Sequence, residues 1–172
     1  VLRRLVRERV SIRDVRLILE GVVEFCSLNP SAEDRLEWLA ELHAFLRIVL
    51  QRSIQDDLRG LGGELRVFVL SQEIEEEFRA AVSSWDFARG KLPLDPAVET
   101  SLRTQAQIMF DPVLERGSLP VVVLAQADIR PAVHDFFARQ MGAAEWLRTL
   151  ADQELSGDVK PQVVGMLSIP EL

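Results

Sequence analysis

The sequence predicts an α+β protein, in which an all-helical first part is followed by a small α/β part with a mixed sheet covered by helices. Apolar residues in the first part recur at the spacings of three and four residues that indicate helices. The second part contains two short apolar runs typical of strands, Glu64–Leu70 and Leu119–Ala125. Glycines gather between the two parts, at residues 60–63. We therefore predict a helical subdomain at residues 1–60 and an α/β subdomain at residues 61–172.

The chain opens with a short basic helix that we expect to end at Val10-Ser11. Ser11 and Asp14 have the spacing of a capping box, so a second helix is predicted to begin there. Asn29-Pro30 ends it, because proline cannot continue a helix. Its apolar stripe is expected to face the core and comprises Ile12, Val15, Leu19, Val22 and Cys26.

Ser31 and Asp34 repeat this capping pattern and begin a longer helix, which the glycines at residues 60–63 end. The long helix has two adjoining apolar stripes, and so broad a face predicts packing on more than one side. The stripes comprise Leu36, Leu39, Leu46 and Leu50, and then Trp38, Leu42, Phe45 and Val49.

Helix signals continue after the first strand. Ser71 is expected to cap an acidic helix that runs to about Ser84. Asp95 at the cap and Pro96 at the first helical position begin another helix, which ends before Pro112 or kinks there.

The remaining elements alternate between strand and helix. The run Leu119–Ala125 is nearly all apolar, which is typical of a strand covered on both faces. A helix beginning at Asp128 is predicted to run to about Gln140. Weaker strand patterns follow at Trp146–Leu150 and Val159–Leu167.

Composition excludes several classes of protein. Hydrophobic residues make up 48% and charged residues 27%, so the chain can bury a core. The formal net charge of -7 argues against a nucleic-acid binder that uses its whole surface. The single cysteine, Cys26, excludes an intramolecular disulfide. No apolar run approaches the roughly 20 residues of a membrane span, and since the sequence begins without methionine, we expect a piece of a longer protein.

No motif in the sequence indicates catalysis. The glycines at residues 60–63 precede a strand, whereas a phosphate-binding loop lies between a strand and a helix. His43 has no histidine or cysteine at ligand spacing, which favours a core histidine. The carboxylates within Glu73–Glu77 resemble a solvated helix face. We therefore expect no enzymatic activity, no cofactor and no metal site.

The first 16 residues are strongly basic. Six arginines and two carboxylates leave a local charge of +4 within an acidic chain. Three interpretations are open: a contact with an acidic surface of a neighbouring subunit, a solvated helix face, or a helix-turn-helix that binds DNA. We favour the subunit contact, and its predicted residues are Arg3, Arg4, Arg7, Arg13, Asp14 and Arg16.

Several segments resemble one bacterial family. The run Arg7–Asp14, continued by Ile18–Glu20, is similar to a stretch with the pattern V-(S/P)-I-R-D-L-x-x-I-L-E in the large inner-membrane export-gate proteins of type III secretion and flagellar assembly, the FHIPEP family. The other similar segments, in the order found in that family, are Ile48–Ile54, Pro120–Arg130, Asp152–Leu155 and Val163–Gly165.

The resemblance implies the third and fourth subdomains of the export gate's cytoplasmic domain. In that family, this domain forms a nonameric ring beneath a membrane channel, at the cytoplasmic face of the inner membrane. The ring receives chaperone–substrate complexes and a gatekeeper protein, and it contacts the stalk of the export ATPase. The tail favours virulence-type secretion. The alternatives are the flagellar equivalent and a DNA-binding regulator that uses the basic helices.

The second part of the chain is expected to dock partners. The resemblance places partner docking in the fourth subdomain, and the predicted residues are Ile129, Arg130, Phe136 and Phe137. Two adjacent phenylalanines cannot share one helix face, so we expect one of them to be exposed. The alternative is that both rings lie in a broad core contact.

Overall fold

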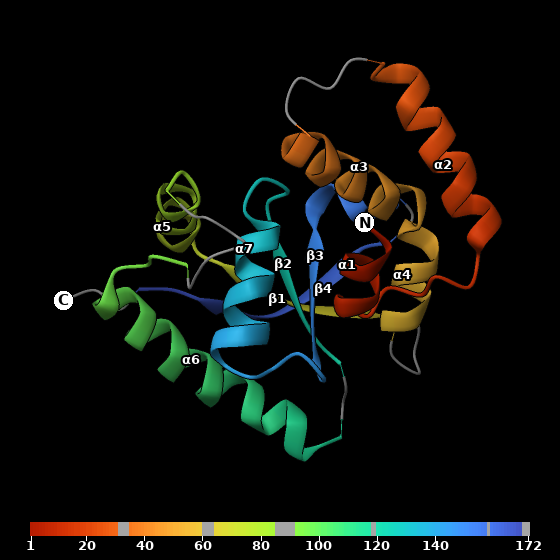
Figure 1. Ribbon diagram of the computed structural model, residues 1–172. Helices are drawn as coiled ribbons and strands as arrows, with labels where there is room; N and C mark the ends of the chain where they lie inside the picture. The colour runs from red at the N-terminus through yellow and green to blue at the C-terminus, as the bar shows by residue number, and fades with distance from the viewer. Residues whose placement is uncertain (31–34, 60–63, 85–91, 118–119, 158, 170–172) are drawn as a thin grey trace.

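A computed structural model describes residues 1–30, 35–59, 64–84, 92–117, 120–157 and 159–169 (Figure 1). It confirms an α+β protein with helices on both sides of a sheet. The first part contains α1 (Leu2–Arg7), α2 (Val15–Leu28), α3 (Arg35–Val49) and α4 (Gln51–Leu58). The second part contains α5 (Gln72–Val82), α6 (Pro96–Glu115), α7 (Arg130–Asp135), a π-helical turn η1 (Phe136–Gln140) and a 3-10 turn η2 (Asp152–Glu154).

The sheet has the strand order β3-β2-β1-β4, and every pairing among the described strands is parallel. The strands are β1 (Leu65–Leu70), β2 (Val121–Ala125), β3 (Leu147–Ala151) and β4 (Pro161–Leu167). All four were predicted, but the expected mixed sheet is wrong. The connection between β3 and β4, residues 152–160, is short, but a chain of that length can extend about 30 Å. This reach is enough to cross the sheet from one edge to the other.

Each face of the sheet supports its own hydrophobic core. Leu65, Val67 and Val122 face the helices of the first part, α1 to α4. Phe68 and Val123, on the opposite face, pack in the core formed with α5, α6 and α7. Figure 1 shows these three helices on that side of the sheet. Because neighbouring strand residues alternate between the two faces, the central strands are apolar along most of their length.

The first helix ends at Arg7, three residues before the predicted break at Val10-Ser11, and it does so in a specific geometry. The Val10 backbone N–H donates to the Leu5 carbonyl at 2.9 Å, and the Arg9 N–H donates to the Val6 carbonyl at 3.0 Å. These two bonds form a Schellman motif, whose left-handed position glycine usually takes. Here Arg9 takes it, with φ at 59°.

The second helix begins later than predicted. Asp14, not Ser11, is its cap, because the Asp14 carboxylate accepts the Leu17 N–H at 2.9 Å. The helix ends at Leu28, next to Asn29 as expected. The predicted caps Ser31 and Asp34 lie outside the described residues.

The predicted long helix is divided into α3 and α4 at Leu50. Leu50 still continues the hydrogen-bond pattern, since its N–H donates to Leu46 and its carbonyl accepts from Ile54. The glycines at residues 60–63, which mark the predicted subdomain boundary, lie outside the described residues.

Most helix limits in the second part agree with the sequence. Asp95 caps α6, its carboxylate accepting the Ala97 N–H at 2.7 Å, and Pro96 occupies the first turn. The helix does not end before Pro112 but continues to Glu115. The predicted helix at residues 128–140 is present as α7 and the π-helical turn η1.

Candidate functional site

The basic residues predicted at a subunit interface lie on α1 and on the corner before α2. The exposed members of this set are Arg3, Arg7, Arg13, Asp14 and Arg16. Arg4 differs, because its Nε lies 3.2 Å from the Glu8 carboxylate and its side chain is only 25% exposed. Arg16 pairs with Glu20 at 2.8 Å, and both side chains are exposed to solvent. This end of the molecule therefore presents an exposed basic surface.

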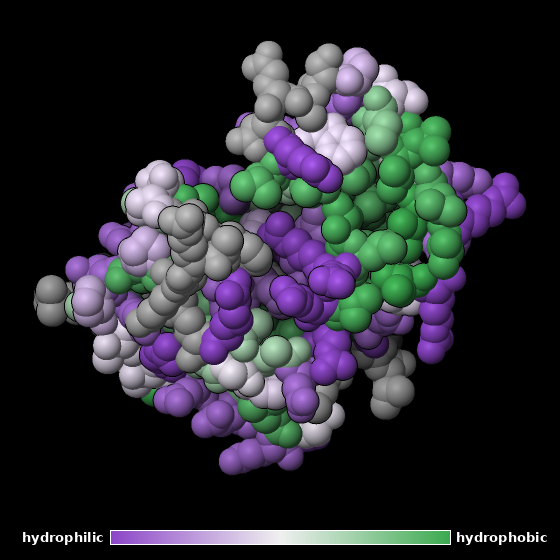
Figure 2. All heavy atoms as spheres, viewed as in Figure 1, coloured by the Kyte–Doolittle hydropathy of each residue, from purple (hydrophilic) through white to green (hydrophobic). Residues whose placement is uncertain are grey.

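Beside it, α2 presents an apolar face to solvent. Val15, Leu19 and Val23 are 57%, 59% and 66% exposed. Figure 2 shows hydrophobic residues gathered over α2, at the right of the view. A contiguous apolar surface of this kind is typical of an interaction site. We call the exposed side chains of Val15, Leu19 and Val23 the α2 face.

The α2 face corrects the predicted core stripe. Ile12, Val15, Leu19 and Cys26 were expected in the core but are exposed. The core side of α2 instead carries Ile18, Gly21 and Phe25, which pack towards α3. The helix has apolar residues on more than one side, and α3 covers only one of them.

Four buried charged side chains from distant parts of the chain meet in the interior. Glu8 follows α1, Arg47 lies on α3, Arg130 on α7 and Glu154 on η2. We call these four residues the ionic cluster. It joins the helical first part to the α/β part, and its two arginines balance its two carboxylates.

Arg47 is held by both carboxylates of the ionic cluster. Its Nε and Nη2 donate to the two Glu154 oxygens at 2.6 Å each, and its Nη1 donates to Glu8 at 2.8 Å. The Thr149 carbonyl accepts a further bond from Nη2 at 3.1 Å. The forked geometry of arginine makes such two-point contacts to a carboxylate strong and directional.

Arg130 completes the cluster from the other side. Its Nη1 and Nη2 donate to the two Glu8 oxygens at 2.9 and 3.3 Å, and its Nε lies 3.7 Å from Glu154. Burial alone would raise the pKa of Glu8, but the Arg130 and Arg47 guanidiniums outweigh burial and hold that pKa well below its usual range. Glu8 is therefore ionised at neutral pH.

His43 is a buried neighbour of the cluster. Burial lowers the pKa of His43 to about 3, against the opposing attraction of Glu8. Its Nε2 lies 3.4 Å from the Glu8 carboxylate but makes no hydrogen bond there. The imidazole is thus neutral at pH 7, in agreement with the expected position in the core.

The ionic cluster was not predicted. One signal was present, because Arg47 lies on the apolar face of its helix, four residues after His43 and three before Leu50. Glu8 and Glu154 gave no such signal, since only the tertiary fold brings them together.

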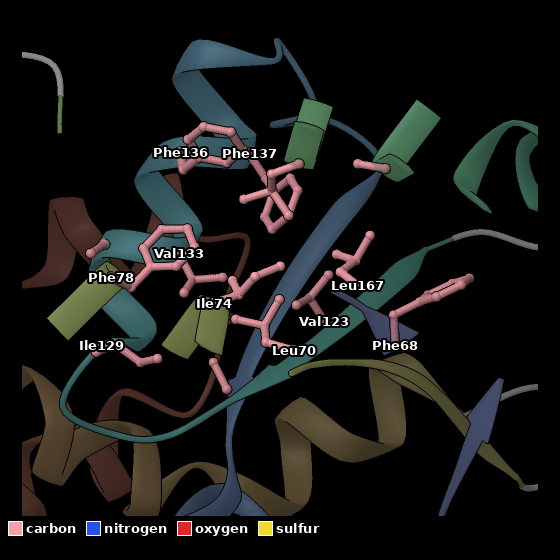
Figure 3. Close-up of a cluster of buried hydrophobic side chains, with 14 of the residues drawn as sticks. Phe68, Leu70, Ile74, Phe78, Val123, Ile129, Val133, Phe136, Phe137 and Leu167 are labelled. Atoms are coloured by element: carbon pink, nitrogen blue, oxygen red, sulfur yellow. The ribbon is translucent and has the colours of Figure 1, made fainter. Parts of the chain in front are cut away.

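The residues predicted to dock partners are buried, so the expectation of an exposed edge at them is wrong. Ile129, Phe136 and Phe137 are 0% exposed and Arg130 is 3% exposed. Figure 3 shows both phenylalanine rings pointing into the core on the α5–α7 side of the sheet.

The reason is that α7 and η1 are covered on more than one side. The ring centroid of Phe136 lies 5.9 Å from that of Phe78 on α5. The ring centroid of Phe137 lies 5.8 Å from that of Phe110 on α6. Two adjacent residues can therefore both be buried, each against a different helix.

Other candidate chemistry has little structural support. In the part of the chain that the structure describes, no group of three His, Cys, Asp or Glu side chains could hold a metal ion. Glu73 and Glu76 are exposed on α5, as a solvated helix face requires. Among the described helices, none combines the length and apolarity needed to cross a bilayer.

Sequence comparison finds relatives over nearly the whole chain. The model of the FHIPEP family matches residues 1–160. The "Low calcium response locus protein D" of Yersinia pestis is 30% identical over 98% of the chain, and the "Flagellar biosynthesis protein FlhA" of Caulobacter vibrioides is 29% identical over 97%. The chain spans about a fifth of the length of these relatives, 22% in both cases.

Solved structures share the fold. The Chlamydia pneumoniae CdsV protein is 25% identical with a TM-score of 0.74, and 96% of the chain covers 44% of it. The nonameric EPEC SctV-C is 25% identical with a TM-score of 0.72, and 96% of the chain covers 46% of it. The CdsV protein in complex with CdsO is 23% identical with a TM-score of 0.68, and 96% of the chain covers 45% of it.

Proposed function

Because the chain belongs to the FHIPEP family of type III secretion and flagellar export-gate proteins, we propose that it is a ring-forming and docking module of an export gate. The nonameric state of the similar SctV-C protein supports a ring of nine copies. In this proposal the chain binds other proteins and catalyses no reaction. Its parent is anchored in the bacterial inner membrane, with this part on the cytoplasmic face.

The observation that carries the proposal is the α2 face beside the basic end of the chain. Val15, Leu19 and Val23 are more than half exposed, although side chains of this kind are usually covered in a monomer. The arginines next to them add a charge opposite to that of the whole chain. Burial of the apolar side chains supplies affinity, and the charges set the register between copies.

A second copy of the chain offers the matching surface. The full chain has a net charge of -7, while its first 16 residues carry +4. A basic end meeting an acidic surface is a head-to-tail contact, and such contacts close into rings when the rotation allows. We therefore infer that α1 and the α2 face of one copy contact the acidic remainder of the next.

Partners other than the chain itself are part of the proposal. We propose that the ring receives chaperone–substrate complexes and a gatekeeper protein, and that it contacts an ATPase-stalk protein. The complex of the similar CdsV protein with CdsO supports binding of a partner by this fold. No contact with nucleic acid is proposed, because the acidic balance of the chain disfavours it.

We also assign the module to virulence-type secretion. The test is to put this chain in place of the matching segment in the Yersinia relative and, separately, in a flagellar relative. We expect secretion to be restored in the first chimera, and motility to remain lost in the second. Restored motility without restored secretion would instead favour the flagellar equivalent.

Sedimentation velocity over a wide concentration range tests the subunit contact. We expect the complete cytoplasmic domain to self-associate, and the association to weaken with salt because charges steer it. Arg3→Glu with Arg7→Glu should weaken it further. Arg116→Glu is the matched control, since Arg116 is an exposed arginine at the end of α6. Equal association of the two variants would refute a contact at the basic end.

A further inference from the structure

An open cavity of about 300 Å³ lies between the end of α1, α4 and β3. Arg9, Asp57 and Arg148 line it, together with the side of the ionic cluster formed by Glu8 and Arg47. Its size falls at the lower end of small-ligand sites and suits a single functional group with its immediate neighbours. None of the residues predicted for the subunit contact lines this cavity.

The charges of the cavity wall do not cancel. The ionic cluster is neutral by itself, so the excess comes from the other three side chains. Arg9 and Arg148 contribute two positive charges and Asp57 one negative charge, which leaves one positive charge. Within the described ranges, no carboxylate lies within ion-pair distance of either arginine.

Arg148 is a cation with little compensation. Burial lowers the pKa of Arg148, the nearby charge of Arg9 lowers it further, and Asp57 opposes them. Its Nη1 donates to the Leu147 and Glu145 carbonyls at 2.8 and 3.3 Å. Its Nε and Nη2 have no hydrogen-bond partner among the described residues. A guanidinium that is partly desolvated and close to another is stabilised by an anion between the two.

Arg9 occupies a position where the backbone favours glycine. A non-glycine residue in the left-handed region costs of order 1 kcal/mol or more, and such residues are concentrated at functional sites. The Schellman motif fixes the direction of the chain here and directs it past the cavity. The left-handed position thus holds a cation at the cavity wall at a conformational cost that glycine would avoid.

We propose that this cavity binds a carboxylate group. One excess positive charge matches a singly charged carboxylate, whereas a phosphate dianion would exceed it and would meet Asp57 and Glu8. The carboxylate lies between the two guanidiniums and accepts hydrogen bonds from both. Its source is either a free small carboxylic acid or an acidic side chain of a bound peptide.

Nuclear magnetic resonance of the full chain distinguishes these sources. The arginine Nε–Hε signals of Arg9 and Arg148 are followed during titration with butyrate, a free acid with a single carboxylate, and then with a capped peptide that carries one glutamate. Sodium chloride at equal ionic strength and the glutamine version of the peptide are the blanks. Saturable shifts with butyrate indicate a free acid, and shifts with the glutamate peptide alone indicate a peptide. No saturable shift beyond the blanks with either probe would overturn the proposal.

Variants separate binding from folding. Arg9→Gly keeps or improves the stability of the fold, because glycine suits the left-handed position, and we expect it to weaken binding about tenfold. Arg148→Gln should weaken binding to a similar extent, and Asp57→Asn should tighten it. The matched control is Arg116→Gln, an exposed arginine at the end of α6 and outside the cavity. Unchanged binding in both Arg9→Gly and Arg148→Gln, or weaker binding in Asp57→Asn, would refute the site.

Discussion

Glu8→Gln should be among the most destabilising single changes in the chain. Glu8 is 6% exposed and accepts hydrogen bonds from Arg47 and Arg130 at 2.8 and 2.9 Å. Glutamine has nearly the same shape but no charge, and its NH₂ group would face guanidinium donors. The ionic cluster would then carry one uncompensated positive charge in a buried place.

The magnitude follows from this geometry. Removing one partner of a buried ion pair costs about 3–5 kcal/mol, because the remaining charge is left without compensation. In a domain of this size, each kcal/mol lowers Tm by about 2–4 °C, so the expected loss is roughly 6–20 °C. Arg47 keeps its two bonds to Glu154, which favours the lower half of the range.

Urea unfolding followed by circular dichroism measures the effect. Glu20→Gln is the matched control, because Glu20 pairs with Arg16 on the surface and such a pair contributes about 0.5 kcal/mol or less. Combining Glu8→Gln with Arg130→Met should cost less than the sum of the two single changes, since the two residues interact directly. A Glu8→Gln variant within about 1 kcal/mol of the parent protein would refute the reasoning.

Three further predictions concern pH and packing. Burial lowers the pKa of His43 from 6.5 to about 3, so between these pH values the unfolded chain binds more protons than the folded chain. The free energy of unfolding should therefore fall as pH decreases from 6.5, by up to about 5 kcal/mol. His43→Gln should flatten this dependence in unfolding measured at several pH values. Gly21→Ala should lower the free energy of unfolding in urea by about 1 kcal/mol, because the new Cβ would lie 2.9 Å from Leu46 Cδ2. This overpacking exceeds the gain in helix propensity. An unchanged urea midpoint would contradict this prediction. Phe137→Ala should lower the free energy of unfolding by about 3–5 kcal/mol, because the Phe137 ring is fully buried against Phe110. If this variant lost partner binding without losing stability, the idea of an exposed docking edge would be restored.

Local signals in the sequence predicted most of the elements. The Asp95-Pro96 cap, the apolar run of β2 and the break after α1 each depend on a few neighbouring residues, and each is present. The sequence predicts the cap of α2 at Ser11, but the cap is Asp14; the two are hard to distinguish because both residues can accept a backbone N–H. Such an error moves a helix end by one turn and leaves the fold unchanged.

Errors of a different kind concern what covers each element. A helix with apolar residues on several sides does not reveal which side α3 covers, so Val15 and Leu19 of the α2 face were assigned to the core. Phe136 and Phe137 follow each other in sequence, but the contacts that bury them come from α5 and α6. The partners of such residues are set by tertiary packing, which spacing along the chain does not encode.

The ionic cluster shows the same limit most clearly. Arg47 and Glu154 are separated by 107 residues, and Glu8 and Arg130 by 122. A charged residue within an apolar stripe signals that a partner exists somewhere, as at Arg47, but not which residue it is. The resemblance to the export-gate family predicted the proposed function without predicting either the α2 face or the ionic cluster.

Electron microscopy of the complete cytoplasmic domain, with and without Leu19→Ser and Val23→Ser, tests the ring proposal most directly. Both side chains are more than half exposed, so their replacement should leave the fold intact. Ile108→Ser is the matched control, because Ile108 is 68% exposed on α6, away from α2. We predict rings of nine for the parent protein and the control, and single copies for the double variant. Intact rings in the double variant would contradict the assignment of the α2 face to the subunit contact.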